Sequence, residues 1–321
     1  MPTDPAAAPE TNSAAAHAKA AALGRSALIA CALAVLAMAM WSGNWVVVRA
    51  ARTDIPPLGL NFWRWVVAAL VLLPFAGAAA WRDLPAARRH WRVMLGLGAS
   101  GAAVFHSMIN IGLRSTEVIN ALLLNLALPV IIIVMAWAVF RDRVSRRQGI
   151  GIAISLAGGV VLVSRGELAA LARLQFNTGD LWILCALVVW GVYSLLLKRR
   201  PAAIGGLSLL FYMSVIGVAL MAPAYAWETL VAGRAVSLTP SNAASVAYTG
   251  VVASVLAFLC YNAALARIGP NATAFFLLLM PVFGSALAIA FLGERLFLYH
   301  LVAFATVLAG ILLATWRIAR E

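Results

Sequence analysis

Ten long apolar runs constrain the fold of this chain more than any other feature of its sequence. In lipid a segment must satisfy its own backbone groups, and about 20 helical residues cross the hydrocarbon core. With 64% hydrophobic and 11% charged residues, the composition excludes a soluble domain of this length. We therefore predict an all-α membrane protein with ten transmembrane helices, near residues 27–48, 58–80, 93–113, 117–140, 147–164, 180–197, 206–227, 244–266, 271–292 and 297–316.

The basic residues outside these runs indicate how the chain is oriented. They concentrate on the side of the membrane that holds the N-terminus, and the positive-inside rule places that side in the cytoplasm. We expect a multi-pass protein of a bacterial inner membrane with both termini cytoplasmic. The cytoplasmic set is Lys19, Arg25, Arg82, Arg88, Arg89, Arg92, Arg141, Arg143, Arg146, Arg147, Lys198, Arg199, Arg200, Arg267, Arg317 and Arg320, and the opposite set is Arg49, Arg52, Arg114, Arg165, Arg173, Arg234 and Arg295.

The chain is strongly basic, with 24 Lys and Arg against 11 Asp and Glu, but these residues form no continuous basic stripe. The lipid bilayer is therefore an expected partner and nucleic acid is not. Cys31, Cys185 and Cys260 lie in separate apolar runs without metal-ligand spacing, so we expect no disulfide, metal or other cofactor. Residues 1–26, rich in alanine, are predicted to be a disordered cytoplasmic tail before a retained first helix.

The two halves of the sequence repeat one another. Equivalent residues are 149 positions apart early in the repeat and 152 apart later. Five crossings per copy bring the second copy into the membrane from the opposite side, so residues 27–164 and 180–317 are predicted to form two inverted five-helix repeats around a central cavity. The matched pairs include Trp41 with Trp190, Arg49 with Lys198, Pro74 with Pro223, Asn110 with Asn262, Pro129 with Pro281, and Gly158 with Gly310.

Several motifs recur in the two copies. In the second copy they are Ile268-Gly-Pro-Asn-Ala, Leu-Met-Pro281-Val-Phe, Leu-Gly-Glu294-Arg295 and Leu308-Ala-Gly310, with weaker counterparts in the first copy at Pro129, Phe140-Arg-Asp142-Arg143 and Gly158. These motifs resemble those of the ten-helix drug/metabolite transporter superfamily. The first copy departs from the family pattern, which usually has Gly-Glu where this chain has Arg141-Asp142. The resemblance covers residues 27 to 317 and implies a transporter of small metabolites that works by alternating access.

Within that superfamily the nearest resemblance is to bacterial exporters of amino acids, particularly aromatic ones. His106 and Trp190 resemble cavity-lining positions of those exporters, and Arg64 matches a basic residue that the superfamily often places early in its second helix. For Arg64 the alternatives are a snorkelling, structural arginine and a residue that attracts a substrate carboxylate.

Polar and aromatic residues in equivalent places of the two copies are the candidates for binding a substrate. Trp41 and Asn44 share one helix face, as do Trp190 and Tyr193, because each pair is three residues apart. The alternatives are packing for the aromatic side chains and interhelical hydrogen bonds for the asparagines. The full predicted set is Trp41, Asn44, Arg64, His106, Asn110, Trp190, Tyr193, Tyr212, Tyr261 and Asn262. Pro129 and Pro281 are predicted either to kink the fourth and ninth helices for packing or to act as hinges.

The acidic residues bear on the coupling mechanism because all 11 fall in tails, loops or helix ends. A proton-coupled exporter of cationic drugs is expected to hold a carboxylate at mid-membrane, so we predict uniport or exchange. His106 remains a candidate for proton coupling, since imidazole titrates near neutral pH. A zwitterionic amino acid would have its carboxylate bound by Asn44, Asn110, His106 or Arg64, and its ammonium group by carbonyls or aromatic rings.

Other classes of protein have less support in the sequence. An intramembrane enzyme would need a motif such as HExxH or a pair of membrane aspartates, and the sequence has neither. A channel would need a charged ring or a filter sequence, and neither is apparent. Within transport, the alternatives are a nucleoside, a sugar derivative, a sugar phosphate or a drug exported with protons. Small-xxx-small pairs such as Gly98/Ala102, Gly151/Ser155 and Gly250/Ser254 allow close packing within or between subunits, and we expect a monomer or a weak homodimer.

Overall fold

The computed structural model describes residues 10–51, 53–116, 124–141, 144–164, 166–167, 169, 177–292 and 297–315. Within these ranges every regular element is helical and none is a strand. The elements are α1 (Glu10–Ala51), α2 (Pro57–Arg89), α3 (Trp91–Gly98), η1 (Ala99–Val104), α4 (Phe105–Gly112), α6 (Leu128–Phe140), α7 (Arg146–Val163), α9 (Thr178–Lys198), α10 (Gly206–Ala226), η2 (Trp227–Val231), α11 (Pro240–Ala247), η3 (Tyr248–Leu256), α12 (Ala257–Phe276), α13 (Leu279–Leu292) and α14 (Leu298–Thr315).

The apolar runs of the sequence coincide with these helices. Within the described residues, six continuous helical segments are long and apolar enough to cross a membrane: Arg25–Val48, Pro57–Arg89, Trp91–Gly112, Thr178–Lys198, Gly206–Val231 and Pro240–Phe276. Two shorter apolar helices, Leu128–Phe140 and Leu298–Ala314, account for two further runs. Many large apolar side chains on these helices are exposed on the outer surface, for example Phe75 at 72% and Leu70 at 62%, as expected where lipid is the solvent. The chain is therefore a multi-pass membrane protein.

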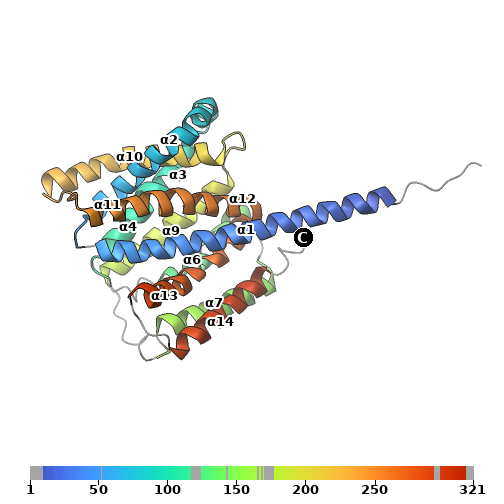
Figure 1. Ribbon diagram of the computed structural model, residues 1–321. Coiled ribbons are helices and arrows are strands. Elements are labelled where there is room, and N and C mark those ends of the chain that lie inside the picture. Colours follow the sequence, from blue (N-terminus) through green and yellow to red (C-terminus); the bar gives the residue numbers. More distant parts are fainter. Residues whose placement is uncertain are drawn as a thin grey trace, which may run out of the picture.

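The N-terminal segment corrects one expectation. Residues 1–26 are predicted from the sequence to be disordered, but residues from Glu10 onward are helical and continue directly into the first apolar helix. This part of α1 projects beyond the bundle (Figure 1). Alanine has the highest helix propensity of all residues, so an alanine-rich segment extends an existing helix without needing a buried face. Residues 1–9 lie outside the described part of the chain.

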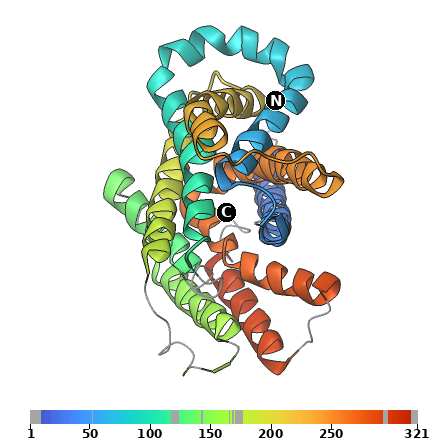
Figure 2. The same cartoon turned by 90° about the vertical axis from the view of Figure 1, so that its left-hand side faces the viewer.

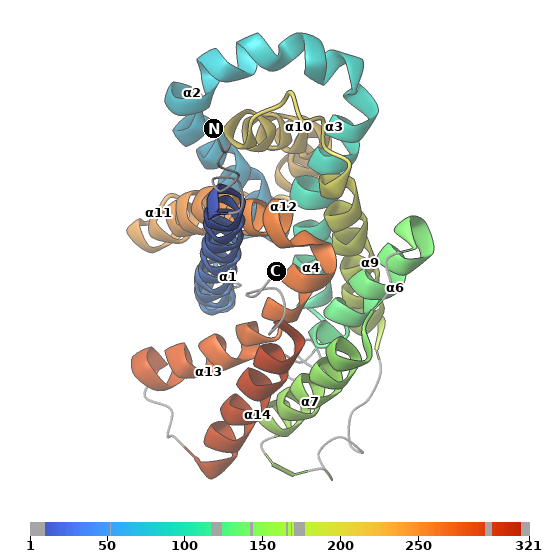
Figure 3. The same cartoon turned by 90° about the vertical axis from the view of Figure 1, so that its right-hand side faces the viewer.

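The helices pack in pairs around a centre built from both halves of the chain. The pair α2–α10 lies on one side of the bundle and the pair α7–α14 on the other, with α1, α12, α4 and α9 between them (Figures 2 and 3). Helix α1 packs on α12 and on α13, and α4 packs on α9. Because α1, α2, α4 and α7 come from the first half and α9, α10, α12, α13 and α14 from the second, the core forms only when the two halves pack together.

Equivalent residues of the two halves meet at several levels of the bundle. The hydroxyl of Ser155 on α7 donates to the carbonyl of Val307 on α14, 152 residues further along, at 3.1 Å. Trp41 and Trp190 are in edge contact with ring centroids 5.2 Å apart. The rings of His106 and Phe258, also an equivalent pair, lie 6.3 Å apart. Residues at matching positions of the two halves therefore contact one another near the centre of the bundle.

The small-xxx-small pairs are all used inside the chain. A Cβ added at Gly151 would lie 2.6 Å from the carbonyl oxygen of Gly310, and one at Gly250 would lie 3.0 Å from that of Arg64. Similarly, Gly98 faces Ile216 on α10, where an added Cβ would lie 2.5 Å from a methyl group. These close approaches let backbones pack directly in the absence of a hydrophobic driving force between helices. The motifs thus serve packing within one chain.

Irregular segments occur at equivalent places in the two halves. The π-helical segments η1 and η3 both lie within a longer apolar helix beside the centre of the bundle. The chain also turns before α6 and again between α12 and α13, immediately before Pro129 and Pro281. Both prolines are predicted to interrupt a helix, but each lies within the first three residues of a new helix, because a proline's missing N–H costs nothing in a first turn. Whether these breaks act as hinges stays a prediction.

A buried glutamate from the second half caps a helix of the first. Helix α2 begins after Pro56 without a side-chain cap of its own. The carboxylate of Glu228 accepts hydrogen bonds from the backbone N–H of Gly59 at 2.7 Å and of Leu58 at 3.3 Å. Glu228 is only 3% exposed, so these buried bonds join the start of α2 to η2, which directly follows α10.

We expect Glu228→Ala to lower the free energy of unfolding by about 1–2 kcal/mol, the usual cost of removing a helix cap. The measurement is SDS-induced unfolding of the purified protein in mixed micelles. Glu167→Ala, at an exposed position, is the matched control and is expected to change stability by less than about 0.5 kcal/mol. Equal effects of the two substitutions would contradict the capping role.

Candidate functional site

A cavity between the two halves brings together many of the residues predicted from the sequence. It encloses about 590 Å³ of space between atoms, part of it open to solvent, and about 50 Å³ of that space admits the centre of a water molecule. One water needs about 10–15 Å³ by this measure, so the cavity has room for several. It is lined by Trp41, Asn44, Trp45, Val48, Arg64, Phe105, His106, Ile109, Asn110, Leu113, Asn125, Leu128, Trp190, Leu277 and Met280.

The position of the cavity along the bundle follows from its lining. On α1 the lining extends from Trp41 to Val48, toward the end of that helix. On α4 it continues in the same direction, and the amide of Asn110 donates to the carbonyl of Pro57 at 3.1 Å, which places the end of α4 beside the start of α2. The cavity therefore lies in the half of the bundle opposite to the end from which α1 projects.

Four aromatic residues, Trp41, Trp190, Phe258 and Tyr261, form an aromatic cluster at the inner end of the cavity. The ring of Trp41 contacts the other three, with centroids 5.0 to 5.4 Å apart. All four side chains are at least 95% buried, and the indole N–H of Trp41 donates to the carbonyl of Ala253 in η3 at 2.9 Å. Only Trp41 and Trp190 reach the cavity surface, while the other two rings support them from behind.

Arg64 supplies a charged group to the cavity. It lies on α2 and is only 2% exposed, so the snorkelling alternative does not hold. Its Nε donates to the hydroxyl of Ser254 in η3 at 2.8 Å, and its guanidinium lies 5.9 Å from the ring centre of Trp65. Its Nη2 is buried and finds no hydrogen-bond partner among the described residues.

Further polar atoms of cavity-lining residues share this property. Nε2 of His106, Oδ1 of Asn44 and Nε1 of Trp190 are buried and have no partner within the described part of the chain. Buried polar groups without a partner are uncommon in folded proteins, and each needs water, an ion or a ligand to offset its lost hydration. Four residues that line one cavity therefore each carry a polar atom that needs such a partner.

The remaining predicted residues lie away from the cavity lining. The hydroxyl of Tyr193 donates to Oδ1 of Asn262 at 2.5 Å, and both side chains are buried behind the aromatic cluster. The hydroxyl of Tyr212 donates to the carbonyl of Ala80, which joins α10 to α2. Tyr261 lies within the aromatic cluster. The structure thus gathers Trp41, Asn44, Arg64, His106, Asn110 and Trp190 around the cavity, and substrate binding by any of them stays a proposal.

The structure also adds residues that reasoning from the sequence missed. Ser254 positions the guanidinium of Arg64, although the sequence offered only its small size as a signal. The hydroxyl of Ser42 donates to the carbonyl of Met280 at 2.9 Å, beside the break before α13. Asn125 lies beside the equivalent break before α6 and lines the cavity. Its amide inside an apolar run could have marked it as a candidate from the sequence.

The arrangement has the parts needed to hold a small amphipathic solute. Its polar side presents a cation, an imidazole and an amide, and its apolar side presents indole rings. Among the described residues, no three His, Cys, Asp or Glu side chains come together as metal ligands would. A polytopic helical protein with an amphipathic cavity between two halves has the architecture expected of a membrane transporter.

Comparison with known proteins identifies the family within that class. The model of the EamA-like transporter family matches residues 28–164 and again residues 177–316. The chain therefore belongs to the EamA-like transporter family, part of the drug/metabolite transporter superfamily, and is a transporter rather than an enzyme.

Individual relatives are distant but span most of the chain. An uncharacterized transporter of Archaeoglobus fulgidus is 23% identical over 286 residues, covering 88% of this chain and 96% of that protein. A probable terminal-alkyne amino-acid exporter of Streptantibioticus cattleyicolor is 27% identical over 283 residues, covering 88% and 92%. One crystal structure is similar in fold, with a TM-score of 0.74 at 20% identity, covering 91% of this chain and 98% of the other.

Proposed function

We propose that this protein exports small metabolites from the bacterial cytoplasm across the inner membrane, and that its substrates are amino acids of the neutral or aromatic class. The observation that carries the proposal is the cavity itself, whose lining combines the indole rings of Trp41 and Trp190 with Arg64, His106 and Asn44, each of which has a polar atom without a partner among the described residues. An amino acid with an apolar side chain has matching polar and apolar ends. The name of the relative described as an amino-acid exporter supports the same class.

The proposed mechanism is alternating access by two inverted five-helix repeats. Contacts between equivalent residues, such as Trp41 with Trp190 and Ser155 with Val307, support a symmetry axis that passes beside the cavity. Inverted repeats can exchange conformations across the membrane, which closes the cavity on one side and opens it on the other. The breaks before Pro129 and Pro281 adjoin the cavity lining and are proposed as hinges.

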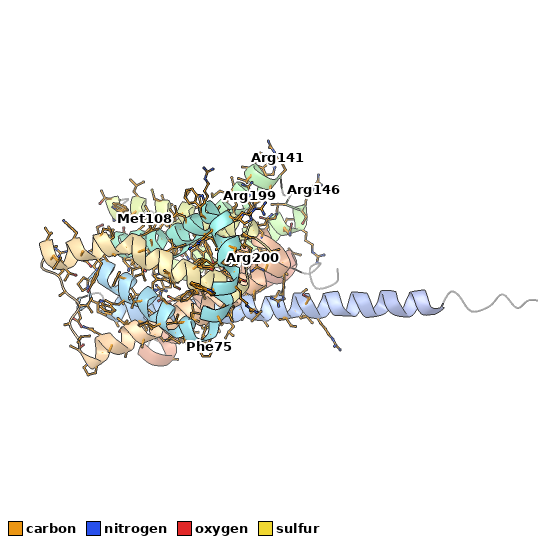
Figure 4. The ribbon with its side chains drawn as sticks, turned by 90° about the horizontal axis from the view of Figure 1, so that it is seen from above. Phe75, Met108, Arg141, Arg146, Arg199 and Arg200 are labelled. Atoms are coloured by element: carbon orange, nitrogen blue, oxygen red, sulfur yellow. The ribbon has the colours of Figure 1, made fainter. Side chains whose placement is uncertain are left out.

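The proposed orientation rests on the distribution of basic residues. Arg141, Arg146, Arg199 and Arg200 lie at the end of the bundle from which α1 projects (Figure 4). The positive-inside rule assigns that end, with both termini, to the cytoplasm. The cavity then lies in the outer half of the membrane, so this conformation is the one that releases an exported solute.

We further propose that transport occurs by uniport or exchange, because the sequence holds its acidic residues in tails, loops and helix ends. The placement of His106 in the cavity lining favours one alternative, a proton-coupled exporter of another metabolite or a drug. Flux through uniport or exchange follows the substrate gradient alone. Flux that follows an imposed proton gradient at a fixed substrate gradient would favour the alternative.

The test of the proposed function is uptake of radiolabelled amino acids into liposomes that hold the purified protein, with and without unlabelled amino acids inside. We expect flux of neutral or aromatic amino acids, and we expect Trp190→Ala to reduce it at least about ten-fold by removing a ring from the cavity surface. Trp182→Ala on the same helix, where the side chain is 43% exposed, is the matched control and should transport normally. No flux for any amino acid would refute the proposed substrate class.

A further inference from the structure

Among the described residues that line the cavity, Arg64 alone carries a permanent charge, and its guanidinium is only partly hydrogen-bonded. One nitrogen of the Arg64 guanidinium, Nε, is bonded to Ser254. A second, Nη2, is buried without a partner among the described residues. A charged residue inside the membrane costs several kcal/mol and is usually retained for function. The Ser254 bond fixes the direction of the guanidinium and leaves its free edge for a ligand.

The neighbouring atoms fit a carboxylate better than an ammonium group. A carboxylate accepts two parallel hydrogen bonds from a guanidinium, which are about twice as strong as bonds between neutral groups. A solute ammonium next to Arg64 is repelled instead, and this repulsion is strong because the site has a low effective dielectric constant. The ammonium group of an amino acid would therefore point away from Arg64.

We propose that Arg64 binds the carboxylate of the substrate, and that the cavity selects amphipathic carboxylates whether or not they carry an ammonium group. This inference rests on the proposed function, in which the cavity holds the exported solute. The apolar part of the substrate lies against the indole rings of Trp41 and Trp190. The substrate class then includes N-acylated amino acids and aryl carboxylates alongside free amino acids.

The test compares three ligands that share one side chain: phenylalanine, N-acetylphenylalanine and phenylalaninamide. Binding to the full-length protein in nanodiscs is measured by isothermal titration calorimetry. We expect both carboxylates to bind, and we expect the amide, which keeps the ammonium but loses the carboxylate, to bind at least about ten-fold more weakly. Because this comparison uses the unaltered protein, it does not depend on any variant folding.

Variants at one position then assign the effect to Arg64. Arg64→Gln is expected to abolish the preference for carboxylates over the amide, and Arg64→Lys to retain part of it because the positive charge remains. Arg267→Gln, an exposed arginine that donates to the carbonyl of Ala263, is the matched control and should keep the full preference. Thermal unfolding midpoints of all variants show whether each is folded.

The outcomes separate this inference from the proposed function. An amide that binds as tightly as phenylalanine, an Arg64→Gln variant that weakens all three ligands equally, or no binding by either carboxylate would overturn the inference. Arg64-dependent binding of N-acetylphenylalanine together with no amino-acid flux would uphold the inference and refute the proposed function. Amino-acid flux that the amide inhibits as well as phenylalanine does would uphold the function and overturn the inference.

Discussion

Trp41→Ala is expected to lower the free energy of unfolding by about 3–5 kcal/mol, the range for truncating a large buried aromatic residue. The side chain is only 5% exposed and contacts the other three members of the aromatic cluster. Its removal opens a hole between α1 of the first half and η3 and α12 of the second. The measurement is SDS-induced unfolding in mixed micelles.

Two further variants separate packing from hydrogen bonding at Trp41. Trp41→Phe keeps an aromatic ring but removes the indole N–H that bonds to Ala253, so a loss of about 1 kcal/mol is expected. Trp81→Ala removes an indole that is 78% exposed on α2, and it should change stability by less than about 0.5 kcal/mol. If Trp41→Ala were no more damaging than Trp81→Ala, the aromatic cluster would not hold the two halves together.

Gly151→Ala is expected to destabilise the protein by about 1–3 kcal/mol, the usual cost of overpacking a close contact. The added methyl group would lie 2.6 Å from the carbonyl oxygen of Gly310 and 2.9 Å from the backbone nitrogen of Ala314. Both are backbone atoms, which cannot move aside as a flexible side chain can. The helices α7 and α14 would have to separate, and the bond between Ser155 and Val307 would stretch.

The matched control for this prediction lies two residues earlier on the same helix. At Gly149 an added Cβ would meet no atom of the described residues within 4 Å. Gly149→Ala should therefore be neutral or stabilise α7 by up to about 1 kcal/mol, because alanine favours helix over glycine. Thermal unfolding midpoints in detergent rank the two variants. A Gly151→Ala midpoint equal to or above that of Gly149→Ala would show that α7 and α14 do not pack this closely.

Much of the fold was predictable because its causes are local. An apolar run of sufficient length must form a helix in lipid, since nothing else there satisfies the backbone, and the helical segments lie where the runs predicted them. Identical residues recur at a nearly constant spacing along the sequence, for example Trp41 and Trp190, and this pattern predicted two related halves. The rings of that pair are in contact. The alanine-rich segment after Glu10 was misjudged because its helix needs no amphipathic pattern.

The candidate site was predictable only in part. Trp41, Asn44, His106 and Trp190 were predicted from their helix faces and do line the cavity, since spacing along a helix sets the direction of a side chain. Tyr212 was also predicted to line the cavity, but its hydroxyl bonds to the carbonyl of Ala80 in α2 instead. No pattern in the sequence distinguishes a tyrosine that lines a cavity from one that joins two helices.

The sequence by itself determined the class of structure, the repeated halves and the kind of residue available for binding. Only the tertiary structure decided which polar atoms find partners. The guanidinium of Arg64 bonds to a serine 190 residues away, and Tyr193 bonds to Asn262 across 69 residues. In contrast, the cavity-lining residues Arg64, His106 and Asn44 each keep a buried polar atom without a partner among the described residues. Helix formation in lipid depends on neighbours in sequence, but the partner of a buried side chain depends on how distant helices pack.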